Sequence, residues 1–126
     1  MAIRAALAQI DPTVGDLEGN SRIILERAGK AAARGANLIL FPEMALTGYP
    51  IEDLALSRSF QRGAAQALEN LARDLARSGA DRTAVIVGSL GTRRGAPTNI
   101  AAVLRGGKVE DAYVKHRLPN YGVFDE

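Results

Sequence analysis

A short run of consecutive residues, 37–41, most constrains the fold that this chain can adopt. Its sequence is Asn-Leu-Ile-Leu-Phe, and it stops at Pro42, which has no backbone N–H to donate to a sheet. An almost unbroken apolar run of this length is typical of a strand that is buried on both faces. We therefore expect a sheet inside a layered fold.

Other segments of the chain also have the residue pattern of strands. We predict further strands over residues 3–10, 83–90, 98–105 and 108–114. The last two flank Gly106-Gly107, which suits a two-residue hairpin turn.

Two segments carry apolar residues at the three- and four-residue spacing of a helix. The first is predicted to begin at Asn20 as N-cap and to end near Arg34, and the second runs from Ser57 or Ser59 to Ser78. The predicted buried positions are Ile24, Ala28, Ala31 and Ala32 in the first helix, and Phe60, Ala64, Leu68, Leu71 and Leu75 in the second. This alternation of strands and helices predicts an α/β fold.

The composition excludes several classes of protein. Of 126 residues, 47% are hydrophobic and 24% charged, which is ordinary for a globular protein and too hydrophobic for disorder. The net charge is only +2 and shows no clustered basic face, so we expect no nucleic-acid partner. No apolar run approaches the ~20 residues that span a membrane, and no signal peptide is recognisable, so we expect a cytoplasmic location.

The absence of cysteine limits the chemistry of the chain. Because the chain has no cysteine, it can form no disulfide and no thiolate metal site, and it holds no cysteine nucleophile. Because His116 is its one histidine, it can form no histidine metal cluster. The sequence around Ser89 lacks the first glycine of a nucleophile elbow. No P-loop or dinucleotide-binding glycine motif is present. We expect His116 to be a surface residue at the end of a strand.

Two charged residues remain as candidates for catalysis. Glu43 follows the buried strand directly after Pro42, and Lys115 follows the last predicted strand. Ligands of α/β sheets gather at the carboxyl ends of strands, so if the two strands are parallel neighbours both side chains reach one crevice. Charged residues after strands also occur simply where a chain returns to water, and residues without geometry are weak evidence.

Four stretches of the sequence resemble a known family. Residues 38–43 followed by Thr47-Gly48-Tyr49 resemble the first catalytic segment of the nitrilase, or carbon–nitrogen hydrolase, superfamily. Residues 8–16, 48–54 and 115–126 resemble, more specifically, the glutaminase domain of glutamine-dependent NAD⁺ synthetases. The resemblance covers the whole chain, residues 1–126, as the N-terminal portion of such a domain, without the synthetase domain.

The resemblance implies a nitrilase-like α-β-β-α sandwich, here an incomplete N-terminal portion, with a Glu-Lys-Cys triad. Glu43 corresponds to the general base and Lys115 to the residue that stabilises the tetrahedral intermediate. Tyr121 corresponds to a tyrosine that lines the glutamine pocket, with Tyr49 nearby. The cysteine nucleophile is expected beyond Glu126, so the chain alone is expected to be inactive.

The chemistry implied by the resemblance is glutamine hydrolysis. A carboxylate takes the thiol proton, and we expect partial burial to raise the pKa of Glu43. Lysine stabilises the developing oxyanion. The released ammonia converts nicotinate adenine dinucleotide to NAD⁺ at a synthetase domain that uses ATP and Mg²⁺. The fragment itself is expected to hold no cofactor, and the family implies a homo-oligomer.

Two alternatives stay open on the sequence. A stand-alone nitrilase-type amidase needs the same glutamate and lysine, but not the segment Pro119-Asn120-Tyr121. The other alternative is a non-catalytic interaction module built on a truncated or degenerate fold, and the absence of cysteine favours it for the chain taken by itself.

Overall fold

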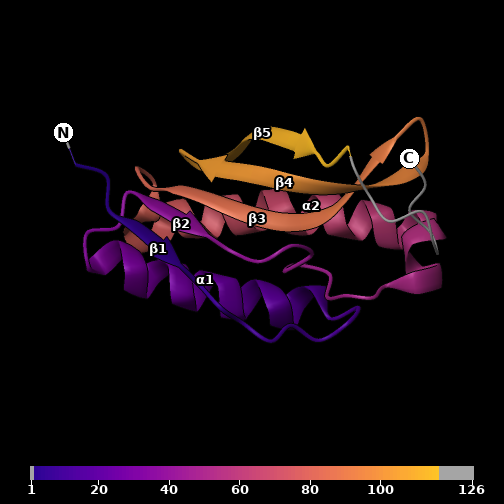
Figure 1. Ribbon diagram of the computed structural model, residues 1–126, viewed down its shortest axis with the longest axis horizontal. Helices are drawn as coiled ribbons and strands as arrows, with labels where there is room; N and C mark the ends of the chain where they lie inside the picture. Colours follow the sequence, from indigo (N-terminus) through magenta and orange to yellow (C-terminus); the bar gives the residue numbers. More distant parts are fainter. Residues whose placement is uncertain (1, 117–126) are drawn as a thin grey trace.

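The computed structural model describes residues 2–116, which form one mixed sheet and two long helices (Figure 1). The strands are β1 (Ala5–Leu7), β2 (Leu38–Leu40), β3 (Ala84–Arg93), β4 (Ala96–Arg105) and β5 (Lys108–Val114). The helices are α1 (Leu17–Ala33) and α2 (Arg58–Leu75), with two short helical segments, η1 (Glu52–Leu56) and η2 (Ala76–Ala80). The predicted order of strands and helices is confirmed.

The order of strands in the sheet equals their order in the chain, β1-β2-β3-β4-β5. β1, β2 and β3 are parallel, whereas β4 and β5 each run antiparallel to the preceding strand. The parallel pairs need long crossovers, which α1 and α2 provide, while the antiparallel pairs need only tight turns. One of these turns is Gly106-Gly107, as the sequence predicts.

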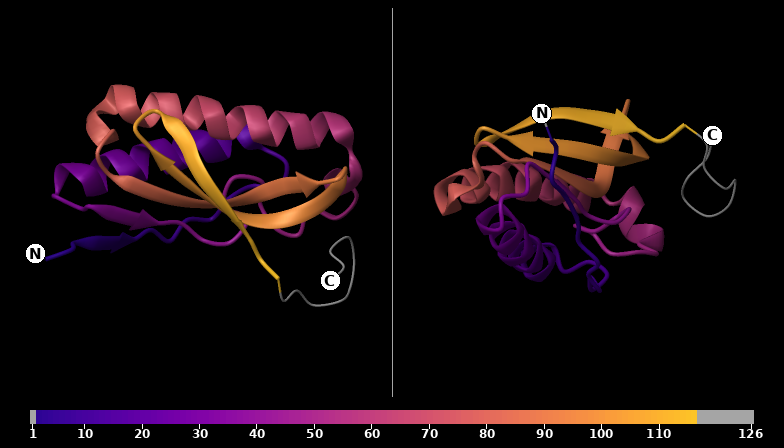
Figure 2. Two further views of the ribbon diagram at one scale, coloured as in Figure 1. Left: turned by 90° about the horizontal axis from the view of Figure 1, so that it is seen from above. Right: turned by 60° about the vertical axis from the view of Figure 1, so that its left-hand side comes forward.

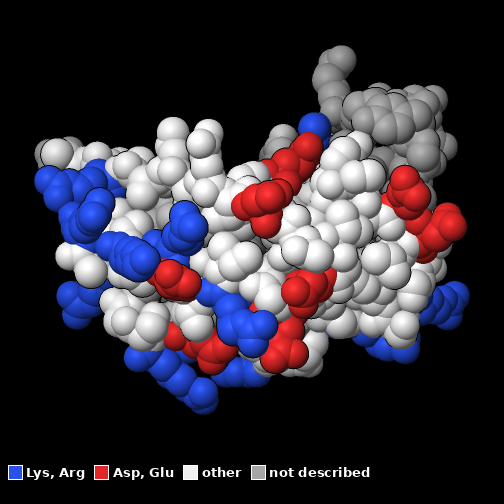
Figure 3. Space-filling model, turned by 90° about the horizontal axis from the view of Figure 1, so that it is seen from below, with Lys and Arg blue, Asp and Glu red and all other residues white. Residues whose placement is uncertain are grey.

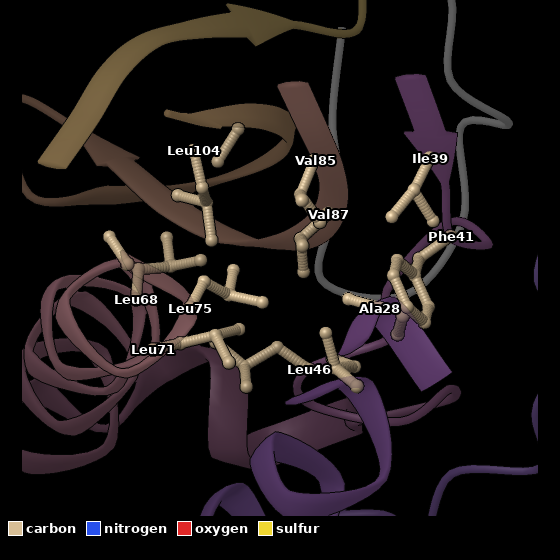
Figure 4. Close-up of a cluster of buried hydrophobic side chains, with 14 of the residues drawn as sticks. Ala28, Ile39, Phe41, Leu46, Leu68, Leu71, Leu75, Val85, Val87 and Leu104 are labelled. Atoms are coloured by element: carbon tan, nitrogen blue, oxygen red, sulfur yellow. The ribbon is translucent and has the colours of Figure 1, made fainter. Parts of the chain in front are cut away.

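Both helices cover the same face of the sheet (Figures 1 and 2). The core lies between them and the sheet, where leucines of α2 meet side chains from the middle strands (Figure 4). The labelled contributors include Leu68, Leu71 and Leu75 from α2, Ile39 from β2, Val85 and Val87 from β3, and Leu104 from β4. The predicted helix faces are confirmed, except that Ala31, Ala32 and Phe60 are only half-buried.

The opposite face of the sheet is apolar and is left uncovered by residues 2–116. Leu38 and Leu40 of β2 are half-buried, while Leu7 of β1 is 76% exposed and Tyr113 of β5 is 66% exposed. The expectation that β2 is buried on both faces is therefore wrong for the described residues. Their two helices cover only the face of the sheet to which Ile39 points.

The first helix begins earlier than predicted, because a different residue caps it. Asp16 is the N-cap, and its Oδ1 accepts a hydrogen bond from the Gly19 N–H at 3.0 Å. Asn20, the predicted cap, is buried inside the helix and bonds instead to the loop residue Thr13 and to the Leu46 carbonyl. Its amide joins α1 to the turn after β2, which is a tertiary role.

The second helix begins as predicted, and the first strand is shorter than predicted. The Ser57 hydroxyl caps α2 by accepting a hydrogen bond from the Phe60 N–H at 3.2 Å. The strand predicted over residues 3–10 keeps ladder pairing only over Ala5–Leu7. β1 pairs with the equally short β2, which limits its regular length.

The surface of the molecule that is seen from below carries charges of both signs (Figure 3). Figure 3 shows basic and acidic side chains intermixed on the face seen from below, with basic groups more numerous toward one end. Two ion pairs lie along the exposed side of α1, Arg22 with Glu18 and Lys30 with Glu26. Such exposed pairs contribute only a few tenths of a kcal/mol each.

Candidate active site

Glu43 lies in a turn that crosses the neighbouring strand closely. The turn follows β2, and the Leu46 N–H donates to the Gly88 carbonyl of β3 at 3.0 Å. A Cβ atom placed on Gly88 would lie 2.4 Å from the Pro42 carbonyl oxygen and 2.5 Å from the Met44 nitrogen. Only glycine leaves room for this backbone crossing, so Gly88 sets the path of the turn that carries Glu43.

Lys115 is the first residue after β5, and it continues the pairing of that strand with β4. Its N–H donates to the Asn99 carbonyl at 2.9 Å. From there its side chain reaches the turn after β2, where Nζ lies 2.6 Å from the Glu43 Oε1. The structure thus brings the two predicted catalytic side chains together.

The route by which Glu43 and Lys115 meet differs from the one expected. β2 and β5 are not neighbours, since β3 and β4 lie between them. The two strands nevertheless point the same way, because two antiparallel steps restore the direction of β3. The side chains meet because the turn after β2 crosses over β3 at Gly88, toward β4.

A third residue of the cluster, Asn99 on β4, was missed in the sequence. Its Nδ2 donates to the Glu43 Oε1 at 2.9 Å, and the residue is only 5% exposed. The available signal was an asparagine inside a predicted strand, next to the apolar Ile100-Ala101. Asparagine is rare in strands and seldom buried, so a buried one usually has a specific hydrogen-bond partner.

The pKa of Glu43 lies below its ordinary value of 4.5, contrary to the expectation that burial raises it. The largest cause is the hydrogen bond from Lys115, which favours the ionised carboxylate. Desolvation acts in the opposite direction but is outweighed, and the Asn99 hydrogen bond lowers the pKa further. Half of the Glu43 side chain remains exposed, which limits desolvation. Glu43 is therefore ionised at neutral pH and able to accept a proton.

A pocket of about 290 Å³ opens beside this cluster. Glu43, Asn99 and Lys115 form its polar part, and its other walls are mainly apolar: Phe41, Pro42, Ile86, Gly88, Ile100, Ala101 and Tyr113. A proton acceptor and an ammonium group thus face a largely apolar pocket. This combination suits a reaction in which a proton is removed and negative charge develops on a substrate oxygen.

The other predicted site residues lie apart from this pocket or outside the described part. Tyr49 is 49% exposed, and the described residues that line the pocket do not include it. Tyr121 lies outside the described residues. His116 is exposed, as predicted, and its ring packs edge-on against Tyr113 with the centroids 5.8 Å apart.

The described residues contain neither a cluster of metal ligands nor a helix that could span a membrane. Within residues 2–116, no three His, Cys, Asp or Glu side chains come together in a way that could hold a metal. Over the same range, neither long helix has the length and apolar character needed to cross a bilayer.

The sequence matches a known family along nearly its whole length. The model of the carbon-nitrogen hydrolase family matches residues 4–126. The chain belongs to the carbon-nitrogen hydrolase family. The sequence resemblance implies a Glu-Lys-Cys triad, and the described residues bring its glutamate and lysine, Glu43 and Lys115, into contact.

Individual relatives of this carbon-nitrogen hydrolase chain are large proteins. The glutamine-dependent NAD(+) synthetase of Thermotoga maritima is 42% identical over 124 residues, which cover 98% of this chain but 21% of the relative. The solved glutamine-dependent NAD⁺ synthetase of Acinetobacter baumannii, in complex with ADP, is 34% identical with a TM-score of 0.79. That match covers 98% of this chain and 22% of the solved one.

A smaller member of the fold is also similar. The amidase of Nesterenkonia sp. AN1 is 25% identical with a TM-score of 0.74, over 98% of this chain and 49% of the amidase. The predicted nitrilase-like α/β fold is confirmed, and the described residues supply one helix layer and one sheet of it. The chain spans about a fifth of the length of the curated relatives it matches.

Proposed function

We propose that this chain is the N-terminal part of the glutaminase domain of a glutamine-dependent NAD⁺ synthetase. The observation that carries the proposal is the contact between Glu43 and Lys115, because it joins a proton acceptor to a cation at one pocket. The identity of 42% to an NAD(+) synthetase supports this substrate class over other amides.

In the proposed reaction Glu43 is the general base. It is ionised at neutral pH, so it takes the proton of a cysteine thiol supplied by a segment beyond residue 126. The thiolate attacks the glutamine side-chain amide and forms a tetrahedral intermediate. Lys115 stabilises the negative oxygen of this intermediate, a contribution of the kind worth about 3–4 kcal/mol in other enzymes.

The protonated Glu43 then gives its proton to the leaving nitrogen, which departs as ammonia and leaves a thioester. Water, deprotonated by Glu43, hydrolyses the thioester and frees glutamate. The ammonia is used at a separate synthetase domain, where ATP and Mg²⁺ support the amidation of nicotinate adenine dinucleotide. Tyr121 and Tyr49 are proposed to contact glutamine, and the complete protein is proposed to be a cytoplasmic homo-oligomer.

A stand-alone amidase is the second candidate function. It is favoured by the fold shared with the Nesterenkonia amidase, of which this chain covers about half. It needs the same Glu43–Lys115 pair but no synthetase domain. A non-catalytic interaction module is less well supported, because such a module has no need for an ionised glutamate and a lysine held 2.6 Å apart beside a pocket.

The test is an assay of the full-length protein. NAD⁺ formation from nicotinate adenine dinucleotide and ATP is measured with glutamine or with ammonia as nitrogen donor, alongside hydrolysis of glutamine and of short aliphatic amides. Glutamine-dependent NAD⁺ formation supports the proposal. Hydrolysis of simple amides without any NAD⁺ formation supports the stand-alone amidase, and no amide hydrolysis at all supports the interaction module.

A further inference from the structure

Asn99 bonds to both of the charged residues of the cluster, and it does so with two different groups. Its side-chain Nδ2 donates to the Glu43 Oε1 at 2.9 Å. Its backbone carbonyl accepts from the Lys115 N–H at 2.9 Å. One residue of β4 therefore connects the turn after β2 with the end of β5, although these segments are not adjacent in the sheet.

The two oxygens of the Glu43 carboxylate have different surroundings. Oε1 accepts hydrogen bonds from the Lys115 Nζ and the Asn99 Nδ2. Among the hydrogen bonds within residues 2–116, none reaches Oε2. Because two donors already occupy Oε1, Oε2 is the oxygen that the described residues leave open to take up a proton.

We propose that Asn99 is a positioning residue that holds Oε1 of Glu43 against Lys115 and so commits Oε2 to proton transfer. This inference rests on the proposed glutaminase function and adds a member to its site. An amide suits the position because it donates a hydrogen bond without carrying a charge. A second lysine would compete with Lys115 for the carboxylate, and a second carboxylate would repel it.

The burial of Asn99 supports this role over that of a polar residue placed by chance. Its side chain is almost fully removed from water, so its N–H needs a partner within the protein. That partner is the Glu43 carboxylate, which is half-exposed and so has access to water as an alternative hydrogen-bond donor. The bond also helps to keep Glu43 ionised, as the lowered pKa indicates.

The test compares two substitutions that keep the branching and the number of non-hydrogen atoms of the asparagine side chain. Asn99→Leu removes the donor, and Asn99→Asp replaces it with a carboxyl group that donates only when protonated. Thr83→Val is the control, because it removes another buried hydrogen bond, from the Thr83 hydroxyl to the Ala36 carbonyl, away from the pocket. All variants are made in the full-length protein and checked by thermal unfolding.

For Asn99→Leu we expect kcat with glutamine to fall about 10- to 100-fold, as for the loss of a hydrogen bond to a charged group, with KM nearly unchanged. Ammonia-dependent NAD⁺ formation should stay within roughly twofold of wild type. For Asn99→Asp the loss should be greatest at alkaline pH and smallest at acidic pH, where the introduced carboxyl is protonated. A purely structural role would lower both reactions at every pH, and that result would overturn the proposal.

A second measurement does not depend on the substrate. The titration of the Glu43 carboxyl is followed by ¹³C NMR with labelled glutamate, and its signal is assigned by its absence in Glu43→Gln. The other groups that face it are the Lys115 ammonium and, at the pocket wall, Tyr113, which contacts His116. We expect the pKa of Glu43 to rise in both Asn99 variants and not in Thr83→Val.

The two readouts separate the possible failures. If wild type does not hydrolyse glutamine, the proposed function fails, and the titration alone decides whether Asn99 positions Glu43. If wild type hydrolyses glutamine but Asn99→Leu changes neither kcat nor the titration, the role of Asn99 is rejected and the proposed function stands.

Discussion

The Nζ of Lys115 lies 2.6 Å from the Oε1 of Glu43, although the two residues are 72 positions apart in the chain. Their strands are separated by β3 and β4, so the sheet itself does not place them side by side. The contact depends on one close crossing of the turn after β2 over Gly88. The function that we propose depends on this contact.

Substitution of either charged residue should uncouple the two reactions of the full-length protein. In Glu43→Gln and Lys115→Ala, glutamine-dependent NAD⁺ formation should fall at least about 100-fold, because the base or the cation is lost. Ammonia-dependent formation should be largely retained. Lys30→Ala, which breaks only an exposed pair with Glu26, is the control and should leave both rates near wild type. A well-folded Glu43 or Lys115 variant that loses the ammonia reaction would show that the roles are misassigned.

A methyl group at Gly88 should disturb the site without changing either charged residue. Gly88→Ala places its Cβ against the backbone of the turn that carries Glu43, and such overpacking costs about 1–3 kcal/mol. We expect a lower melting temperature and a reduced kcat with glutamine. The matched control is Gly29→Ala in α1, where a Cβ meets nothing within 4 Å and should stabilise the helix by about 0.5–1 kcal/mol. Equal stability of the two variants would contradict the close crossing.

The stability of the protein should depend on the ionisation of Glu43. Its pKa is lowered on folding, chiefly by the Lys115 hydrogen bond, so the ionised form stabilises the folded state. This contribution is fully present above the ordinary value of 4.5 and is lost as the pH falls through the lowered pKa. Because half of each side chain is exposed, it should be below about 1 kcal/mol.

Urea unfolding of wild type and Glu43→Gln across the acidic range measures this contribution. The difference in unfolding free energy between them should shrink as the pH falls. A difference that grows toward acidic pH would mean that the pKa of Glu43 is raised on folding.

The 126-residue chain, prepared alone, should associate and should not hydrolyse glutamine. It exposes an apolar sheet face that includes Leu7 and Tyr113, and such surfaces and open sheet edges promote association. It contains no cysteine to act as nucleophile. Light scattering should show that Leu7→Lys reduces association, whereas Leu56→Lys, on the exposed short helix η1, has little effect. A cooperative monomer, or glutamine turnover that depends on Glu43, would contradict this prediction.

The sequence by itself determined most of the local elements and the two charged residues that the structure brings together. The apolar spacing of α2 and its Ser57 cap, and the paired glycines between β4 and β5, act over a few residues and are visible in the sequence. Glu43 and Lys115 were predicted from strand ends and from family resemblance.

Only the tertiary structure decided how these pieces come together. In the tertiary structure Asn20 bonds to the Leu46 carbonyl instead of capping α1, and Asn99 donates a hydrogen bond to Glu43. Two strands, β3 and β4, lie between β2 and β5 in the sheet. The tertiary structure also reversed the expected pKa shift of Glu43, because a direct hydrogen bond from Lys115 outweighs partial desolvation. Periodicity and capping act between near neighbours in the chain. Packing contacts join residues tens of positions apart, and these contacts fix the direction in which each polar group points.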